Sequence, residues 1–127
     1  MPMIQPQIAA SAAENAVLTK ATLRAAELLD VTARILASII GVSEATVSRM
    51  RKQEFLLERG TKPFELAVLF VRLFRSLDAI VGGDETIARA WLKNANTAFD
   101  GAPAEKIQTI SGLVDVIAYL DSRRALV

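Results

Sequence analysis

The chain has 127 residues, of which 52% are hydrophobic, and a net charge of +1. This composition excludes a disordered protein. Charged residues interrupt every apolar run before it reaches the roughly 20 residues that a membrane span needs. The absence of cysteine and histidine excludes disulfides and zinc–thiolate sites, and it removes the usual general base and the commonest transition-metal ligand. We therefore expect a protein that is not an enzyme, with no catalytic residue, no metal and no cofactor.

Residues 1–16 are predicted to form a flexible arm, because they carry two prolines and several alanines and show no hydrophobic period. The opening sequence MPMIQPQIAA also lacks the basic region and the continuous apolar stretch of a secretory signal, so a soluble cytoplasmic protein is expected. Over residues 17–29, alanine and leucine recur at helical spacing, which predicts the first helix.

Two short helices are predicted next, on either side of a glycine. Asp30 or Thr32 can cap the first of them, which ends at Gly41 because glycine adopts the left-handed conformation without strain. Ser43 can cap the second, which reaches about Gln53.

The segment QEFLLERGTKP (residues 53–63) contains the strongest break in the middle of the chain and predicts a domain boundary. A long helix is predicted over residues 64–81, with an apolar face so broad that two neighbours must bury it. Asp84 can cap a further helix, the turn-rich loop NANTAFDGAP follows, and Pro103 starts a short helix. A last helix begins near Ser111. With no strand pattern and no internal repeat, the predicted fold class is all-α.

The two short helices fit the spacing of a helix-turn-helix. Ala37 is a small residue that lets the second helix approach, Gly41 follows four positions later at the turn, and Val47 lies six positions after that. The inward apolar face comprises Leu36, Ile40, Val42, Val47 and Met50. Residues 17–62 are therefore predicted to form a helix-turn-helix DNA-binding domain. The alternative is a helical hairpin whose polar face is only solvated.

The outward face of the second short helix follows from its 3.6-residue period, once Val47 and Met50 point inward. It presents Ser43, Glu44, Ala45, Ser48, Arg49 and Lys52. The small side chains among them let a helix enter a major groove. Residues 17–62 hold eight Lys or Arg against five acids, a modest excess that permits binding to double-stranded DNA without demanding it.

Different roles are predicted for the polar side chains of this helix. Glu44 can accept a hydrogen bond from cytosine N4, and Arg49 can make a bidentate contact with guanine. Thr46, Arg51 and Lys52 are better placed for phosphates, which position a protein on DNA but do not specify sequence.

A set of residues in the second half keeps a recognisable spacing. It comprises Trp91, Leu92, Asn96, Gly101, Pro103, Thr109, Gly112, Val116 and Leu120. A Trp-Leu pair ends a helix, an Asn and a Gly-x-Pro turn follow, and a Thr-x-x-Gly opens the terminal helix. This pattern resembles the C-terminal domain of the Xre/MbcA/ParS family of type II antitoxins. The chain departs from the family pattern at Ala95, Asp100, Lys106 and Ser111.

The resemblance implies a homodimer with two functions, which are to bind a toxin and to bind DNA. Residues 63–127 would form a helical domain for dimerisation and for binding a cognate toxin, often a RES-domain enzyme that destroys NAD. The helix-turn-helix would bind the operon's own promoter, the operator DNA, as a homodimer. The resemblance also implies a set of toxin-binding candidates, namely Trp91, Asn96, Gly101, Arg123 and Arg124, of which the two arginines could reach the toxin's active site.

Structural interpretations of these residues remain open. Trp91 can be a buried anchor against Phe70 and Phe74, Asn96 and Gly101 can serve only the loop backbone, and the two arginines can be cations favoured by a helix C-terminus. At the level of function, the alternatives are a stand-alone dimeric helix-turn-helix repressor, an enzyme and a purely structural helical protein.

Overall fold

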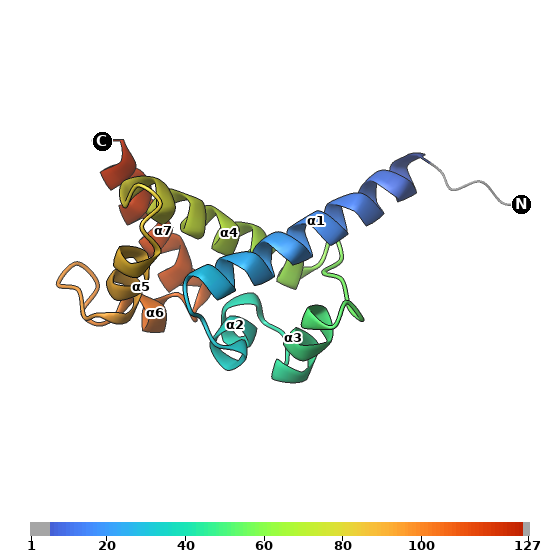
Figure 1. Ribbon diagram of the computed structural model, residues 1–127, viewed down its shortest axis with the longest axis horizontal. Helices are drawn as coiled ribbons and strands as arrows, with labels where there is room; N and C mark the ends of the chain where they lie inside the picture. Colours follow the sequence, from blue (N-terminus) through green and yellow to red (C-terminus); the bar gives the residue numbers. More distant parts are fainter. Residues whose placement is uncertain (1–5, 126–127) are drawn as a thin grey trace, which may run out of the picture.

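The computed structural model describes residues 6–125, and this part of the chain is built from helices (Figure 1). Seven of them are present: α1 (Pro6–Leu28), α2 (Ala33–Ile40), α3 (Glu44–Arg51), α4 (Lys62–Ile80), α5 (Glu85–Lys93), α6 (Pro103–Lys106) and α7 (Ile110–Arg124). Within residues 6–125 no strand occurs, so the all-α prediction is confirmed. None of the described helices combines the length and the apolar character that crossing a membrane requires.

Helix α4 is the central element, because α1, α2, α5 and α7 all pack against it. Its buried residues include Leu66, Ala67, Phe70, Leu73 and Leu77. This agrees with the expectation that several neighbours must cover such a broad apolar face. Buried side chains from both halves of the chain join one hydrophobic cluster around α4. The division into residues 17–62 and 63–127 stays a prediction, because α4 serves the packing of both halves.

Helix α1 begins earlier than the sequence indicated, and the prediction of an arm over residues 1–16 is wrong from Pro6 onward. Proline is tolerated in the first turn of a helix and alanine favours helix strongly. Tertiary contacts then hold the following turns: the Asn15 side-chain oxygen accepts a hydrogen bond from the Arg59 N–H at 3.0 Å, and Glu14 forms an ion pair with Arg59. The first five residues of the predicted arm lie outside the described residues.

Caps fix the limits of α2 and α3, as the sequence indicated. Of the two candidates for α2, Thr32 is the cap, since its hydroxyl accepts a hydrogen bond from a first-turn N–H at 3.3 Å. Gly41 ends α2 in the left-handed conformation, with φ of 74°, and its N–H donates to the carbonyl of Ala37 at 2.9 Å. The Ser43 hydroxyl accepts from the Thr46 N–H at 3.0 Å and so caps α3. These contacts set the angle between the two short helices.

Two side chains of α5 hold the C-terminal end of α1, about sixty residues earlier in the sequence. Arg89 donates a hydrogen bond from Nε to the carbonyl of Leu28 at 2.9 Å. Lys93 forms an ion pair with Asp30, which lies in the left-handed region with φ of 55°. The hydrogen bond from Lys93 is the main cause that lowers the pKa of the Asp30 carboxyl. Helix α5 is therefore tied to the turn that leads into α2.

Replacing Lys93 with glutamine is expected to reduce stability slightly at neutral pH and not at all in strong acid. The pKa of Asp30 is lower in the folded protein than its ordinary value of 3.8, so the ion pair stabilises the fold above that value. This contribution disappears as the pH falls through the folded pKa. Urea unfolding of both proteins at about pH 7 and about pH 2.5 measures the difference. An equal difference at the two pH values would show that the pair with Asp30 is not its source.

Candidate functional site

The α2–α3 pair has the packing of a helix-turn-helix. The buried side chains that join the two helices to the core are Leu36, Ala37, Ile40, Val47 and Met50. Val42, in the turn, is half-buried and packs against the same core. The small Ala37 and the glycine turn allow the close crossing that the motif requires. The inward face predicted from the sequence is therefore confirmed.

Seven of the eight predicted DNA-contacting residues lie on the exposed face of α3 and its flanking residues. They are Ser43, Glu44, Ala45, Ser48, Arg49, Arg51 and Lys52. The centre of the face carries the small side chains of Ala45 and Ser48 together with Lys52, because these positions lie opposite the buried Val47 and Met50 on a 3.6-residue period. Such a face is narrow enough to enter a major groove.

Thr46 is placed differently from the prediction. It is only 8% exposed, and its hydroxyl lies 2.9 Å from the Ser43 hydroxyl and accepts a hydrogen bond from Arg49 Nη2 at 3.1 Å. A hydroxyl engaged on both sides and turned inward is poorly placed to reach a phosphate. Thr46 instead orients the two neighbours that are exposed.

Arg49 is held in place by two contacts that come from different segments. Besides the Thr46 hydroxyl, the ring of Phe55 lies under its guanidinium carbon, at 5.4 Å from the ring centroid. A cation over an aromatic face gains electrostatic stabilisation and loses side-chain freedom. Phe55 was not among the predicted site residues. Its place, six residues after Arg49 in an apolar segment beyond the helix, is the signal that could have indicated it.

Arg51 lies on the opposite flank of α3 from Arg49. It lines two shallow hollows beside α1, in both of which Leu23 takes part. Two cations therefore stand on either side of the central stripe of small residues. From its flank, Arg51 is placed to contact a phosphate backbone that borders a groove.

In the C-terminal half, the loop between α5 and α6 is closed by Asn96 and Gly101, two of the predicted toxin-binding residues. The Asn96 N–H donates to the Gly101 carbonyl at 2.9 Å, and the Asn96 side-chain oxygen accepts from the Ala98 N–H at 2.9 Å. Asp100 and Gly101 both have positive φ, of 53° and 148°. The contacts of these two residues are thus those of loop geometry, and their contact with a toxin stays a prediction.

Trp91 packs in an aromatic cluster with Phe99 and Tyr119. Its ring stacks on Tyr119 with centroids 6.3 Å apart and meets Phe99 edge-on at 6.1 Å. Within residues 6–125 its aromatic ring pairs are these two, and the packing of Trp91 against Phe70 and Phe74 stays a prediction. The loop closure at Asn96 carries Phe99 back onto α5 and α7.

Arg123 extends this aromatic cluster. Its guanidinium carbon lies 5.9 Å from the centroid of the Tyr119 ring, one helical turn earlier. Together they border a hollow of about 430 Å³, lined by Leu77, Ile80, Val81, Ile87, Trp91, Tyr119, Leu120 and Arg123. Aromatic side chains and arginine around an apolar hollow are the composition of energetically important contact sites. Tyr119 was not predicted, although its position four residues before Arg123 on one helix gave the signal.

Arg124 lies elsewhere. It lines a separate groove with Arg72 and Arg75 of α4, and this groove shares no lining residue with the hollow at Trp91. The structure therefore brings Trp91 and Arg123 together and separates the two adjacent arginines. Any interaction that uses both must involve two different faces of the domain.

The Thr-x-x-Gly pattern opens α7 as a cap. The Thr109 hydroxyl accepts a hydrogen bond from the Gly112 N–H at 3.1 Å. A Cβ added at Gly112 would lie 1.9 Å from the carbonyl oxygen of Lys106, so the close approach of α6 to α7 requires glycine. This glycine sets the position of the helix that carries Tyr119 and Arg123.

The packing of α2 and α3 and the exposed face of α3 define a helix-turn-helix protein with a second helical domain. Residues 9–72 match the antitoxin Xre-like helix-turn-helix domain, and residues 76–125 match the antitoxin Xre/MbcA/ParS C-terminal toxin-binding domain. The chain belongs to the Xre/MbcA/ParS family of antitoxins, and the resemblance seen in the sequence is confirmed. A comparison with curated proteins gives no match.

Proposed function

We propose that this protein is the antitoxin of a type II module, which binds and inhibits a cognate toxin and represses its own operon. The observation that supports this most directly is the presence of both family domains on one core, the helix-turn-helix over residues 9–72 and the toxin-binding domain over residues 76–125. A regulator of this kind requires no catalytic group.

On the toxin side, we assign the contact to the hollow at Trp91, Tyr119 and Arg123. It combines an apolar floor, two aromatic walls and one exposed cation. A partner that fills such a hollow gains binding free energy, because it buries rigid aromatic rings. Ile87, an exposed apolar side chain on α5, lies at its edge. We take the toxin to be a RES-domain enzyme that degrades NAD, as the family resemblance implies.

On the DNA side, α3 is the recognition helix. Arg49 and Glu44 contact base edges, Arg51 and Lys52 contact phosphates, and Thr46 positions Arg49 from within the fold. Recognition by a single helix-turn-helix covers one half-site, so operator binding requires two copies on a palindrome.

Growth rescue tests the antitoxin function. The neighbouring open reading frame is expressed alone and then together with this protein, and surviving colonies and cellular NAD are measured. We expect the neighbour to kill and to deplete NAD, and this protein to restore both. Killing without loss of NAD would reject the RES-domain assignment alone. A harmless neighbour, or killing that this protein does not prevent, would favour a stand-alone dimeric repressor.

Replacing Arg123 with alanine is expected to weaken the toxin complex by about 2 kcal/mol, roughly thirtyfold, as for a central arginine of an interface. The guanidinium is exposed, so the fold should be unaffected. The measurement is calorimetric titration of purified toxin, and the matched control is Ser122→Ala, the exposed neighbour on the same helix. If both variants bind like the wild type, the hollow is not the toxin contact.

A further inference from the structure

Tyr119 borders two hollows in the C-terminal half of the protein. One is the hollow at Trp91 and Arg123, which we assign to the toxin. The other, the loop hollow, has a volume of about 570 Å³ and lies between α7 and the loop that joins α5 to α6. This loop lies at the end of the molecule away from the projecting start of α1 (Figure 1). The side chains around the loop hollow that carry charge or aromatic rings are Phe99, Asp100, Lys106, Asp115 and Tyr119.

The charged side chains of the loop hollow leave it with a negative charge. Asp100 and Asp115 contribute two carboxylates and Lys106 contributes one ammonium group, which gives a net charge of −1. Among the residues that the structure describes, 6–125, none of the three takes part in an ion pair. Both aspartates are exposed. A cation supplied by a partner can therefore neutralise the hollow.

Aromatic rings lie beside these charges. Phe99 and Tyr119 meet edge to face, with ring centroids 5.0 Å apart, and both side chains are half-buried. The face of an aromatic ring attracts a cation. A planar guanidinium can lie against a ring while it donates two parallel hydrogen bonds to a carboxylate, which a lysine ammonium group cannot do. Carboxylates next to rings therefore favour arginine as the occupant.

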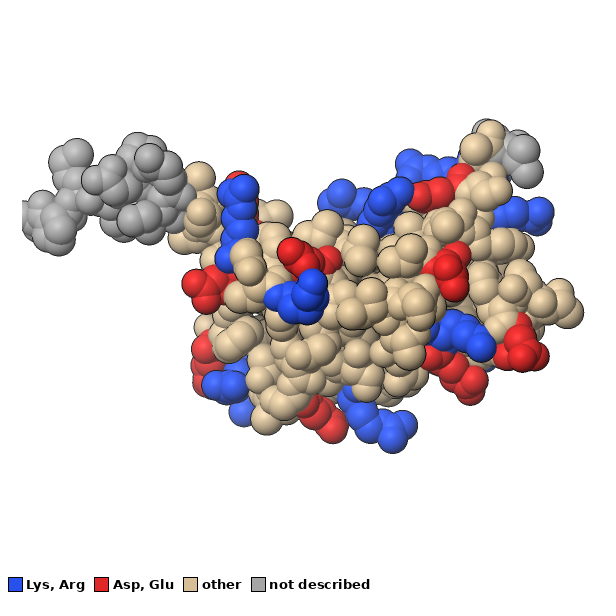
Figure 2. All heavy atoms as spheres, turned by 180° about the vertical axis from the view of Figure 1, so that it is seen from behind, with Lys and Arg blue, Asp and Glu red and all other residues tan. Residues whose placement is uncertain are grey.

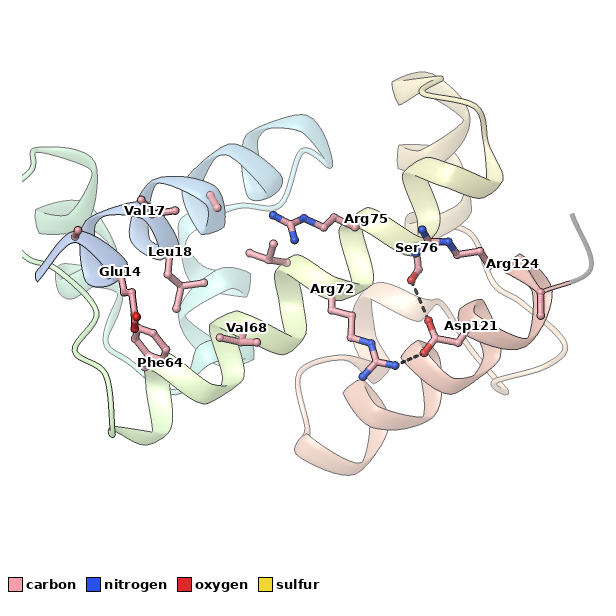
Figure 3. A pocket seen from close by; sticks show the side chains of 14 residues that line it. Glu14, Val17, Leu18, Phe64, Val68, Arg72, Arg75, Ser76, Asp121 and Arg124 are labelled. Atoms are coloured by element: carbon pink, nitrogen blue, oxygen red, sulfur yellow. Dashed lines mark hydrogen bonds and ion pairs between the residues drawn. The ribbon is translucent and has the colours of Figure 1, made fainter. Parts of the chain in front are cut away.

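The groove between α1, α4 and α7 has the opposite electrostatic character. Arg72, Arg75 and Arg124 border it where α4 lies beside the end of α7 (Figure 3). Asp121 forms an ion pair with Arg72, which leaves an excess of positive charge at this place. Figure 2 shows basic side chains gathered at that end of the molecule, away from the projecting α1. A basic group of a partner is repelled there and is attracted to the loop hollow.

The two hollows lie along one face of α7. Asp115, Tyr119 and Arg123 follow one another at intervals of four residues, which places a carboxylate, an aromatic ring and a guanidinium in order over about 12 Å. A toxin that fills both hollows must present an acidic group to Arg123 and a basic group to the other end. We propose that the loop hollow receives an arginine side chain of the toxin, bound by the two carboxylates and by the rings of Phe99 and Tyr119.

This inference rests on the proposed function, because it specifies the chemistry of the toxin surface that the same domain binds. It makes the contact bipartite, with opposite charges in the two hollows, so the direction in which the toxin lies along α7 is fixed. No residue of α2 or α3 lines the loop hollow. A toxin bound there leaves the recognition helix accessible to operator DNA.

Calorimetric titration of the full-length protein with the purified product of the neighbouring open reading frame tests the loop hollow. Asp100→Asn and Asp115→Asn keep the shape of each side chain and remove its charge. Each should weaken the complex roughly tenfold, as the loss of a close charge pair does. The matched control is Glu105→Gln, which neutralises an exposed carboxylate of α6 outside the hollow and should bind like the wild type. If both aspartate variants bind like this control, the proposal is wrong.

Two further variants separate binding from folding. Asp100 has a φ of 53°, which glycine adopts without strain. Asp100→Gly should therefore unfold at a similar urea concentration and still bind the toxin roughly tenfold more weakly. Lys106→Gln removes the ammonium group that competes with the incoming arginine, so it should bind the toxin more tightly than the wild type. Weaker binding by Lys106→Gln would show that the toxin presents an acidic group here, which overturns the proposal.

Charge reversal and growth rescue keep this inference apart from the proposed function. Asp115→Lys should weaken the complex at least a hundredfold and fail to restore growth, because two cations then meet in the hollow. Its affinity for the promoter should equal that of the wild type, which shows that the variant folds. Full rescue by Asp115→Lys would reject the loop hollow and leave the antitoxin function intact. A wild type that does not bind the neighbouring gene product would reject both.

Discussion

Replacing Arg49 with alanine is expected to weaken operator binding by about 1–3 kcal/mol, roughly 5- to 150-fold, and to relax the preference at one base pair. The guanidinium is oriented by the Thr46 hydroxyl and by the ring of Phe55 before any DNA arrives. A guanidinium that is already held in position loses less side-chain entropy when it donates two parallel hydrogen bonds to guanine. Fluorescence anisotropy with the operon's promoter and with single-base variants of it measures both effects.

Three control variants separate the causes of that loss. Arg49→Lys keeps the positive charge but lacks the planar guanidinium that can donate two parallel hydrogen bonds. This variant should therefore lose the base preference and retain the salt dependence of binding. Thr46→Val removes only the hydroxyl that holds the guanidinium and should fall between wild type and Arg49→Ala. Arg24→Ala removes one exposed charge from α1 and should change affinity little. If the titration curve of Arg49→Ala overlays that of the wild type, the recognition surface lies elsewhere.

The Gly112→Ala variant is expected to lower the free energy of unfolding by about 1–3 kcal/mol, as overpacking does in a close contact. The added methyl group would meet the Lys106 carbonyl oxygen at 1.9 Å, and a backbone atom cannot rotate away. Either α6 or the start of α7 must shift. Because α7 carries Tyr119 and Arg123, the affinity for the toxin should fall together with the stability.

Two neighbouring substitutions serve as controls for Gly112→Ala, with urea unfolding as the common measurement. Ser111→Ala changes an exposed residue in the same turn and should be close to neutral. Thr109→Ala removes the cap and should destabilise by about 0.5–2 kcal/mol without a clash. If Gly112→Ala were as stable as Ser111→Ala, the contact between α6 and α7 would be looser than the distance indicates.

The parts of the protein that follow from local rules were predictable. Thr32 and Ser43 cap α2 and α3, and Gly41 ends α2, because each interaction lies within a few residues of sequence. The burial of Val47 and Met50 follows from the helical period alone, so the outward face of α3 could be inferred from the sequence. The same reasoning applies to the cap at Thr109.

The predictions that differ from the structure concern features that depend on contacts between distant segments. The start of α1 is held by Asn15 and Glu14 against Arg59, more than forty residues away. The ring partners of Trp91 were not predicted, because they depend on how the following loop closes, and a turn-rich composition does not specify where its single aromatic residue points. For Thr46, the periodicity left both an inward and a flanking position open, and its hydroxyl contacts decided between them.

Helix α4 has a further consequence for how such a protein can be recombined. The match to the helix-turn-helix domain ends at residue 72, within α4, and the buried Leu73 and Leu77 follow directly. Arg89 then anchors α5 to the last turn of α1. A chimaera that takes its DNA specificity from one antitoxin and its toxin specificity from another therefore has no neutral crossover point in this region. Exchange should succeed by replacing surface residues of α3 or of the hollow at Trp91 while the shared helix is left intact.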